Sequence, residues 1–219
     1  MPARPQPPFD LVIFDNDGVL VDSEWHANGI LADLLCEAGL PSTREGCIAE
    51  YMGSTMARVR EIAELRLGRP LPANLEDRYH ERLFEAFRTK LTAVPGVVGM
   101  LMQLTIPTCV ASSGTHERIR LALTTTGLLP WFDGRIFSAQ DVARGKPAPD
   151  LFLHAAKSLG IRPDRCGVVE DSPLGVDAAN RAGMTAFGFA RMIPPERLQA
   201  AGGGVFRSMD ELPALLGRL

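Results

Sequence analysis

Short apolar runs alternate with amphipathic segments along most of this chain. The first run, Leu11–Phe14, stops at a turn signal, and similar runs occur near 108–112, 135–137, 166–169 and 185–189. Brief apolar runs bounded by turn residues are typical of buried strands. Helical periodicity fills the intervals near 116–126, 149–159, 173–182 and 208–217. The alternation predicts an α/β fold, a doubly wound, Rossmann-like parallel sheet covered by helices on both faces.

The strand pattern disappears between residues 23 and 93. Apolar residues there recur at helical spacing in three groups: Ile30, Leu31, Leu34 and Leu35 before Gly39; Val59, Ile62, Ala63 and Leu65 before Gly68; and Leu75, Tyr79, Leu83, Phe84 and Phe87. Glycine after such a stripe is a common helix terminator. The sequence therefore predicts an all-helical cap domain at 23–93, inserted into a core domain made of 1–22 and 94–219.

Composition and charge narrow the classes of partner. The chain has 219 residues, 46% of them hydrophobic, and a formal net charge of -3. A nucleic-acid partner is not expected, because binding a phosphate backbone needs clustered Lys and Arg. No stretch approaches the length of a membrane span. The first eight residues hold four prolines and lack the apolar core of a signal peptide, so we expect a disordered leader and a cytoplasmic protein.

The cysteines point to the same compartment. Cys36, Cys47, Cys109 and Cys166 show no C-x-x-C spacing, and the last two lie in apolar, strand-like runs. Such cysteines are more often reduced thiols in the protein interior than members of disulfides. We expect buried, reduced thiols.

Two carboxylates follow the first apolar run. Asp15 and Asp17 stand at the predicted carboxyl end of that strand, where ligands bind in an open parallel sheet, and Gly18 closes the turn. Carboxylates this close raise the pKa of at least one of them unless a cation is present. A plain Asp-Gly turn explains Asp17 and Gly18 but not Asp15, and a calcium loop needs its glycine later. On this segment alone, catalysis and a simple turn both stay open.

Further polar groups stand where other strands end. Ser112 ends one apolar run, and its hydroxyl with the N–H groups of Ser113–Gly114 suits an anion, although a helix N-cap is the commoner role. Lys146 lies in the proline-fixed loop GKPAPD, and Glu170 with Asp171 directly follows the run CGVV. A single lysine or carboxylate pair is ordinary on a surface. Two carboxylate pairs at strand ends, with a lysine and a serine, together predict a magnesium and phosphate site.

The segments FDNDGVLVDSE, VASSG, GKPAPDLF and VVEDSPLGVDAA, in this order, resemble the four motifs of the haloacid dehalogenase superfamily of phosphotransferases. The residues of these segments are similar to those of the beta-phosphoglucomutase-like branch of small sugar-phosphate phosphatases. The resemblance runs from Phe9 to the end of the chain, with a helical cap after the first motif.

The resemblance implies a role for each residue of these motifs. Asp15 is the nucleophile that becomes a phosphoaspartate, and Asp17 is the general acid and base. Mg²⁺ is held by Asp15, the Asp17 carbonyl and Asp171, with Glu170 reaching a metal-bound water. Ser112 and Lys146 hold the transferring phosphoryl oxygens. Further substrate or phosphate contacts are assigned to Asn16, Gly18, Ser113, Gly114 and Glu24.

The resulting prediction is an Mg²⁺-dependent phosphatase acting on a small phosphorylated metabolite, a sugar or sugar-acid phosphate. Asp17 favours a phosphate ester over a carbon–halogen substrate, because an alkoxide leaving group needs a proton. Trp25, Glu24 and Met56 are candidates for substrate specificity, although Met and Trp on a helix more often pack. A monomer or a weak homodimer is expected.

The sequence leaves two alternatives open. A phosphosugar mutase of this branch carries a cap Arg and a His, but alignment on Gly18 and Gly53 places Met56 and Ala27 there; His26, Arg58 and Arg60 are the nearest substitutes. A non-catalytic phosphometabolite-binding protein is the other alternative. Competent residue types at every catalytic position weigh against it.

Overall fold

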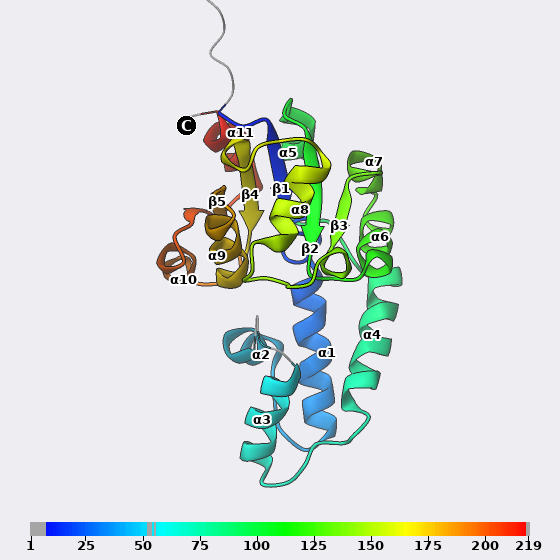
Figure 1. The fold of residues 1–219 in the computed structure, drawn as a ribbon. Helices are drawn as coiled ribbons and strands as arrows, with labels where there is room; N and C mark the ends of the chain where they lie inside the picture. Colours follow the sequence, from blue (N-terminus) through cyan, green and yellow to red (C-terminus); the bar gives the residue numbers. More distant parts are fainter. Residues whose placement is uncertain (1–7, 52–53, 55, 218–219) are drawn as a thin grey trace, which may run out of the picture. The chain divides into compact units, whose positions relative to one another are not determined.

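The computed structural model describes residues 8–51, 54 and 56–217 (Figure 1). The leader up to residue 7 and Gly53, which anchored the mutase alignment, lie outside the described residues. The chain divides into two compact units, Met1–Val21 with Ala93–Leu219, and Asp22–Thr92. Each unit is described by itself below, as the α/β unit and the helical unit.

The α/β unit is built on a six-stranded, wholly parallel sheet in the order β3-β2-β1-β4-β5-β6. The strands are β1 Leu11–Phe14, β2 Thr108–Ser112, β3 Ile136–Ser138, β4 Cys166–Glu170, β5 Thr185–Phe189 and β6 Gly204–Phe206. The predicted fold class is confirmed. The edge strand β6 has no counterpart in the sequence prediction.

The central strand β1 is buried along its whole length because it pairs on both sides, with β2 and with β4. Phe14 is level with Val110 on one side and with Val169 on the other. The chain moves outward from β1 in both directions, so the strand order reverses there. Ligands of open α/β sheets bind at such a reversal, beyond the carboxyl ends of the strands.

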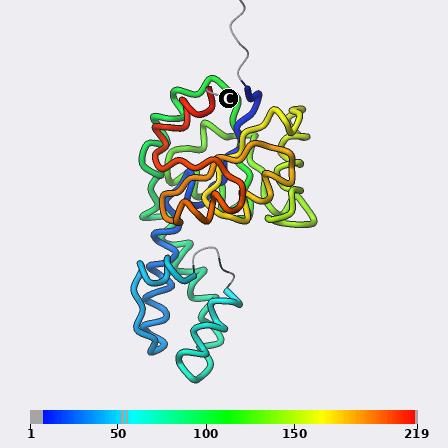
Figure 2. The backbone as a smooth tube through the Cα atoms, turned by 90° about the vertical axis from the view of Figure 1, so that its left-hand side faces the viewer, coloured from blue at the N-terminus to red at the C-terminus, as the bar shows by residue number. Residues whose placement is uncertain are grey.

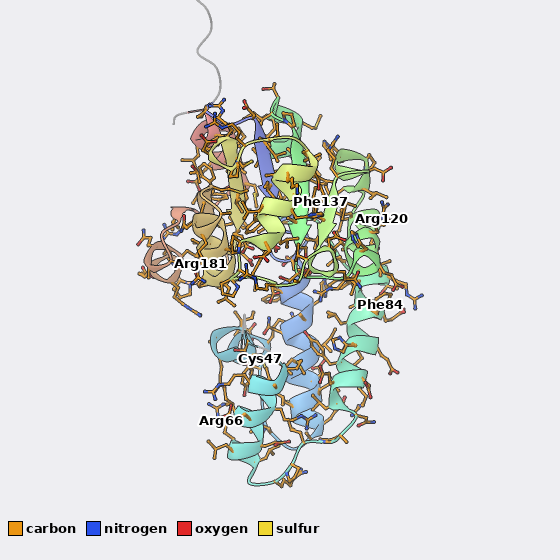
Figure 3. The ribbon with its side chains drawn as sticks, viewed as in Figure 1. Cys47, Arg66, Phe84, Arg120, Phe137 and Arg181 are labelled. Atoms are coloured by element: carbon orange, nitrogen blue, oxygen red, sulfur yellow. The ribbon has the colours of Figure 1, made fainter. Side chains whose placement is uncertain are left out.

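Helices cover both faces of the sheet. They are α5 Val97–Gln103, α6 His116–Thr125, α7 Leu129–Phe132, α8 Asp150–Ser158, α9 Pro173–Arg181, α10 Pro195–Ala200 and α11 Leu212–Leu216, with 3₁₀ turns at Ala139–Asp141, Pro163–Arg165 and Met209–Glu211. Figures 1 and 2 show α8 on one face, with α5 and α11 on the other. On the α8 face, the ring of Phe137, labelled in Figure 3, meets His154 edge-on. The predicted single helix at 208–217 is wrong in its first turn, since α11 begins only at Leu212, just before Pro213.

The helical unit contains α1 Ser23–Glu37, α2 Arg44–Tyr51, α3 Met56–Leu67 and α4 Leu75–Thr89. Its apolar cluster includes Leu34, Leu35, Ala63 and Cys47, the last labelled in Figure 3. The chain enters and leaves this unit side by side, because the Asp22 N–H donates to the Thr92 carbonyl at 2.9 Å.

None of the helices within the described ranges has both the length and the apolar character needed to cross a membrane. All four cysteines are free thiols. Cys47, Cys109 and Cys166 are buried as expected, but the expectation is wrong for Cys36, which is exposed near the end of α1. Its sulfur lies 3.2 Å from the backbone N and O of Ser42.

Candidate active site

The loop that follows β1 holds the first carboxylate pair. Asp15 remains part of the sheet, because its N–H donates to a β4 carbonyl at 2.9 Å. The Asn16 carbonyl then accepts the N–H groups of Leu20 and Val21 at 3.0 and 3.1 Å, which closes a tight loop. Gly18 has φ 77°, a conformation that other residues rarely adopt. The loop thus fixes Asp15 at the end of the central strand.

Lys146 joins Asp15 to Glu170. Its Nζ donates to Asp15 Oδ1 and Glu170 Oε1, both at 2.6 Å, and to the Ala111 carbonyl at 3.1 Å. The lysine side chain is only 6% exposed, and both carboxylates are buried. All three donors of the ammonium group are used. The structure therefore brings together three residues that the sequence predicted for one site, from the loop after β1, the end of β4 and the loop before α8.

Glu170 is held on its other side by the start of α9. Its Oε2 accepts the backbone N–H of Ser172 at 3.0 Å and the Ser172 hydroxyl at 2.8 Å. Gly175, in the first turn of α9, leaves room for the carboxylate, since a Cβ there would lie 1.9 Å from the Glu170 carboxyl carbon. Neither Ser172 nor Gly175 was predicted as a site residue.

This close approach gives a testable result. We expect Gly175→Ala to displace the Glu170 carboxylate and to lower catalytic activity about 10- to 100-fold, the usual cost of losing a partner behind a site. Gly99→Ala in α5 is the matched control, because nothing lies within 4 Å of its added Cβ. That variant should keep full activity and gain about 0.5–1 kcal/mol in free energy of unfolding. Wild-type activity in Gly175→Ala would contradict the prediction, because it would show that activity does not depend on the space that Gly175 leaves for the Glu170 carboxylate.

Burial dominates the electrostatics of the nucleophile position. Burial raises the pKa of Asp15 to about 7. The positive charge of Lys146 lowers this pKa, whereas the negative charges of Glu170 and Asp17 raise it. Burial alone would lower the pKa of Lys146, but the charges of Asp15 and Glu170 outweigh it, so that pKa is raised. The lysine therefore stays charged at neutral pH.

The raised pKa of Asp15 predicts a pH dependence of stability. In the unfolded chain this carboxyl ionises near its ordinary pKa of 3.8, so between there and about 7 the folded state binds the extra proton. Protonation of Asp15 therefore stabilises the folded state. This stabilisation is complete below the pKa of the unfolded chain and is lost as the pH rises through about 7. We expect the free energy of unfolding in EDTA to fall across this range.

Denaturant unfolding at a series of pH values measures this slope. Carboxyl groups with a lowered pKa, such as Glu37 and Asp141, act in the opposite direction and only at more acidic pH. The Asp15→Asn variant is the control, because it has no titrating group at this position. A slope that is the same in both proteins would contradict the assignment.

The second carboxylate pair completes a candidate metal site. Oxygen atoms of Asp15, Glu170 and Asp171 lie within 4.8 Å of one another, and all three residues are buried. Lys146 pairs with two of these three carboxylates, Asp15 and Glu170. Carboxylate oxygens are the donors that Mg²⁺ prefers, so this donor set fits the predicted metal. Asp17 was predicted to bind the metal through its backbone carbonyl. The cluster contains carboxylate oxygens only, so this part stays a prediction.

Ser112 ends β2 at the same edge of the sheet. Its buried Oγ accepts the N–H of Gly114 at 3.1 Å, and the Gly114 carbonyl accepts the Ser138 hydroxyl at 2.6 Å. Ser113 is exposed between them. Ser112 therefore shapes the loop before α6, and its role toward phosphate stays a prediction.

Asp17 has a partner that the sequence analysis missed. Arg118 Nη2 lies 2.8 Å from Asp17 Oδ1, across 101 positions of the sequence. On the same helix, His116 contacts Asp141 Oδ1 through Nε2 at 2.9 Å. One signal for Arg118 was available: a cation in the first turn of a helix opposes the helix dipole, which suggests a nearby carboxylate.

The remaining predicted residues lie in the helical unit. The Glu24 carboxylate accepts a hydrogen bond from Asn28 Nδ2 at 3.2 Å, and the Arg44 guanidinium stacks 4.3 Å from the centre of the Trp25 ring. Met56 is partly buried against the apolar cluster, in keeping with a packing role. Substrate contact by Glu24 stays a prediction.

Comparison with known proteins decides the family. The family model for haloacid dehalogenase-like hydrolases matches residues 9–183. The chain belongs to the haloacid dehalogenase-like hydrolases. It is 30% identical to 6-phosphogluconate phosphatase of Escherichia coli (strain K12), over 94% of each chain. The predicted family and the predicted class of enzyme, a phosphoric monoester hydrolase, are confirmed.

Solved structures of haloacid dehalogenase-like proteins share the fold. A conserved member from Agrobacterium tumefaciens has TM-score 0.90 and 39% identity, covering 95% of this chain and 97% of its own. A family hydrolase from Deinococcus radiodurans R1, solved with bound phosphate and sodium, has TM-score 0.85 and 33% identity, with 96% of each chain covered. The likeness therefore extends over both units of this chain.

Proposed function

We propose that this chain is an Mg²⁺-dependent phosphatase that hydrolyses a small sugar or sugar-acid phosphate through a phosphoaspartyl intermediate on Asp15. The observation that carries the proposal is the buried Asp15–Lys146–Glu170 chain at the end of the central strand, beside Asp171. The relative from Escherichia coli, a phosphatase of 6-phosphogluconate, supports the class of substrate. The helical unit acts as the cap that selects among such substrates.

The first step transfers the phosphoryl group to the protein. A carboxylate oxygen of Asp15 attacks phosphorus, the ester P–O bond breaks, and Asp17 donates its proton to the leaving oxygen. Lys146 and Ser112 hold the phosphoryl oxygens, and Glu170 keeps the lysine in place. When bound by Asp15, the Asp17 carbonyl and Asp171, Mg²⁺ supplies charge that stabilises the transferring phosphoryl group.

The second step regenerates the enzyme. Asp17, now ionised, takes a proton from water as the water oxygen attacks the phosphoaspartate phosphorus. The bond between phosphorus and the Asp15 oxygen breaks, which releases inorganic phosphate and the free carboxylate. Burial of Asp15 and Lys146 shields this chemistry from bulk water.

Hydrolysis rather than isomerisation is proposed because the substitutes for the mutase Arg are engaged. Met56 carries no charge and packs in its own unit. Arg58 pairs with Glu61 at 2.7 Å, and Arg60 pairs with Glu64 at 3.1 Å. Ala27, at the position of the mutase His, is buried in α1. With Arg58 and Arg60 held by these carboxylates, water intercepts the phosphoaspartate before a bisphosphate can form and reorient.

The test is a phosphate-release screen over 6-phosphogluconate, fructose 1-phosphate and a hexitol 6-phosphate. We expect release with Mg²⁺, loss of release in EDTA and recovery when excess Mg²⁺ is added. Phosphorus NMR should show free phosphate, with no isomeric sugar phosphate accumulating faster. Full activity in metal-free buffer would exclude the metal scheme, and absence of release from every ester would exclude the function.

A further inference from the structure

The amino end of α6 is firmly anchored in the α/β unit. Thr115 caps the helix, with its Oγ1 accepting the Arg118 N–H at 3.2 Å. The His116 N–H donates to Gln140 Oε1 at 3.0 Å, and the His116 ring contacts Asp141 at 2.9 Å. The backbone of Arg118 is therefore held both by its own helix and by the segment that follows β3.

From this fixed backbone the Arg118 side chain reaches Asp17, with Nη2 at 2.8 Å from Oδ1. The two side chains are 31% and 16% exposed, so the pair is partly shielded from water. A cation in the first turn of a helix is unfavourable by itself. The position of Arg118 therefore does not stabilise the helix itself. The negative charge that it pairs with is Asp17, the general acid of the proposed mechanism.

We propose that Arg118 is a positioning residue for Asp17, an inference that rests on the proposed function. The guanidinium is always charged and planar, and it holds Oδ1 at a fixed point. Oδ2 is then the oxygen that carries the proton to the leaving group, while Oδ1 accepts from Arg118 whether or not the acid is protonated. Without Arg118 the carboxyl group rotates, and fewer orientations place its proton at the leaving oxygen.

This role differs from a merely structural ion pair in how it depends on the leaving group. An alkyl phosphate leaves as a poor alkoxide and needs the proton of Asp17, whereas 4-nitrophenyl phosphate leaves as a stable anion and needs it little. The value of kcat/KM reports on all steps up to and including phosphorylation of Asp15. Asp17 acts as the general acid in that phosphorylation step. A loss of positioning therefore lowers kcat/KM for the alkyl substrate selectively.

The experiment compares kcat/KM of Arg118→Ala with wild type on 6-phosphogluconate and on 4-nitrophenyl phosphate, with Mg²⁺ present. We expect a loss of about 10- to 100-fold on the sugar-acid phosphate, within the range of general acid catalysis, and less than about 3-fold on the aryl phosphate. Arg118→Lys should recover part of the loss. In an Asp17→Asn background, Arg118→Ala should cost little more, because residues that act through one another are not additive.

Arg120→Ala is the matched control, because Arg120, labelled in Figure 3, lies on the same helix and pairs with Asp133 on the surface. It should leave both substrates unaffected. Equal losses on the two substrates, no loss on either, or full additivity with Asp17→Asn would overturn the inference while leaving the phosphatase assignment standing. A wild-type protein that releases phosphate from neither of these esters, nor from fructose 1-phosphate or the hexitol 6-phosphate, would instead contradict the proposed function itself.

Discussion

Asp15→Asn should abolish phosphate release while the protein stays folded. Loss of a covalent nucleophile lowers kcat by a factor on the order of 10⁴ to 10⁶, since the neutral amide cannot attack phosphorus. The fold should persist, and above pH 7 the metal-free variant should be more stable than wild type. The reason is that burial raises the pKa of Asp15 to about 7, so its ionised form is unfavourable there without a metal.

Steady-state phosphate release and thermal unfolding measure the two effects. Asp10→Asn is the matched control: Asp10 directly precedes β1 and pairs with Arg165 on the surface. That variant should retain activity, and its stability should change by about 1 kcal/mol at most. Normal turnover by a folded Asp15→Asn protein would remove Asp15 from the mechanism.

Lys146→Met should have the second largest effect, on activity and on stability together. Without the ammonium group, the buried carboxyl groups of Asp15 and Glu170 both lose the cation that pairs with them, and breaking a buried ion pair costs about 3–5 kcal/mol. Loss of a preorganised charge at the phosphoryl group should lower kcat by about 10²- to 10³-fold. Both effects have one cause, because the same Nζ contacts both carboxylates.

Activity assays and denaturant unfolding, both with Mg²⁺, check this prediction. Lys157→Met provides the control, since Lys157 is exposed in α8 and the substitution has the same chemistry. It should behave as wild type. If Lys146→Met released phosphate within about 3-fold of wild type, the lysine would be a structural counter-ion and not part of catalysis.

Local sequence patterns were sufficient for the elements that carry the site. The runs ending at Phe14, Ser112 and Glu170 are continuous and apolar because their strands are buried on both faces, so their carboxyl ends were predictable. β6 escaped prediction because three residues at a sheet edge form a strand only through pairing with β5. α2 escaped because it buries only Cys47 and Tyr51, which leaves little periodicity.

Tertiary partners were less accessible from sequence. Lys146 was a candidate because of its proline-fixed loop, yet its bridging of Asp15 and Glu170 depends on how three distant segments pack. Arg118 has one weak local signal, a cation in the first turn of a helix, but its partner Asp17 lies 101 positions away, so the pair is not predictable from local sequence. Gly175 looked like an ordinary helix residue, since its role is to leave space for another side chain.

Chemical trapping of the intermediate tests the central claim most directly. Turnover of 6-phosphogluconate with Mg²⁺ is quenched in acid, the protein is reduced with borohydride, and peptides are sequenced by mass spectrometry. An acyl phosphate on aspartate is reduced to homoserine, so we predict homoserine at position 15 in wild type and in Asp10→Asn, and none in Asp15→Asn. Phosphate release without homoserine at position 15, or with the modification at another residue, would contradict the account.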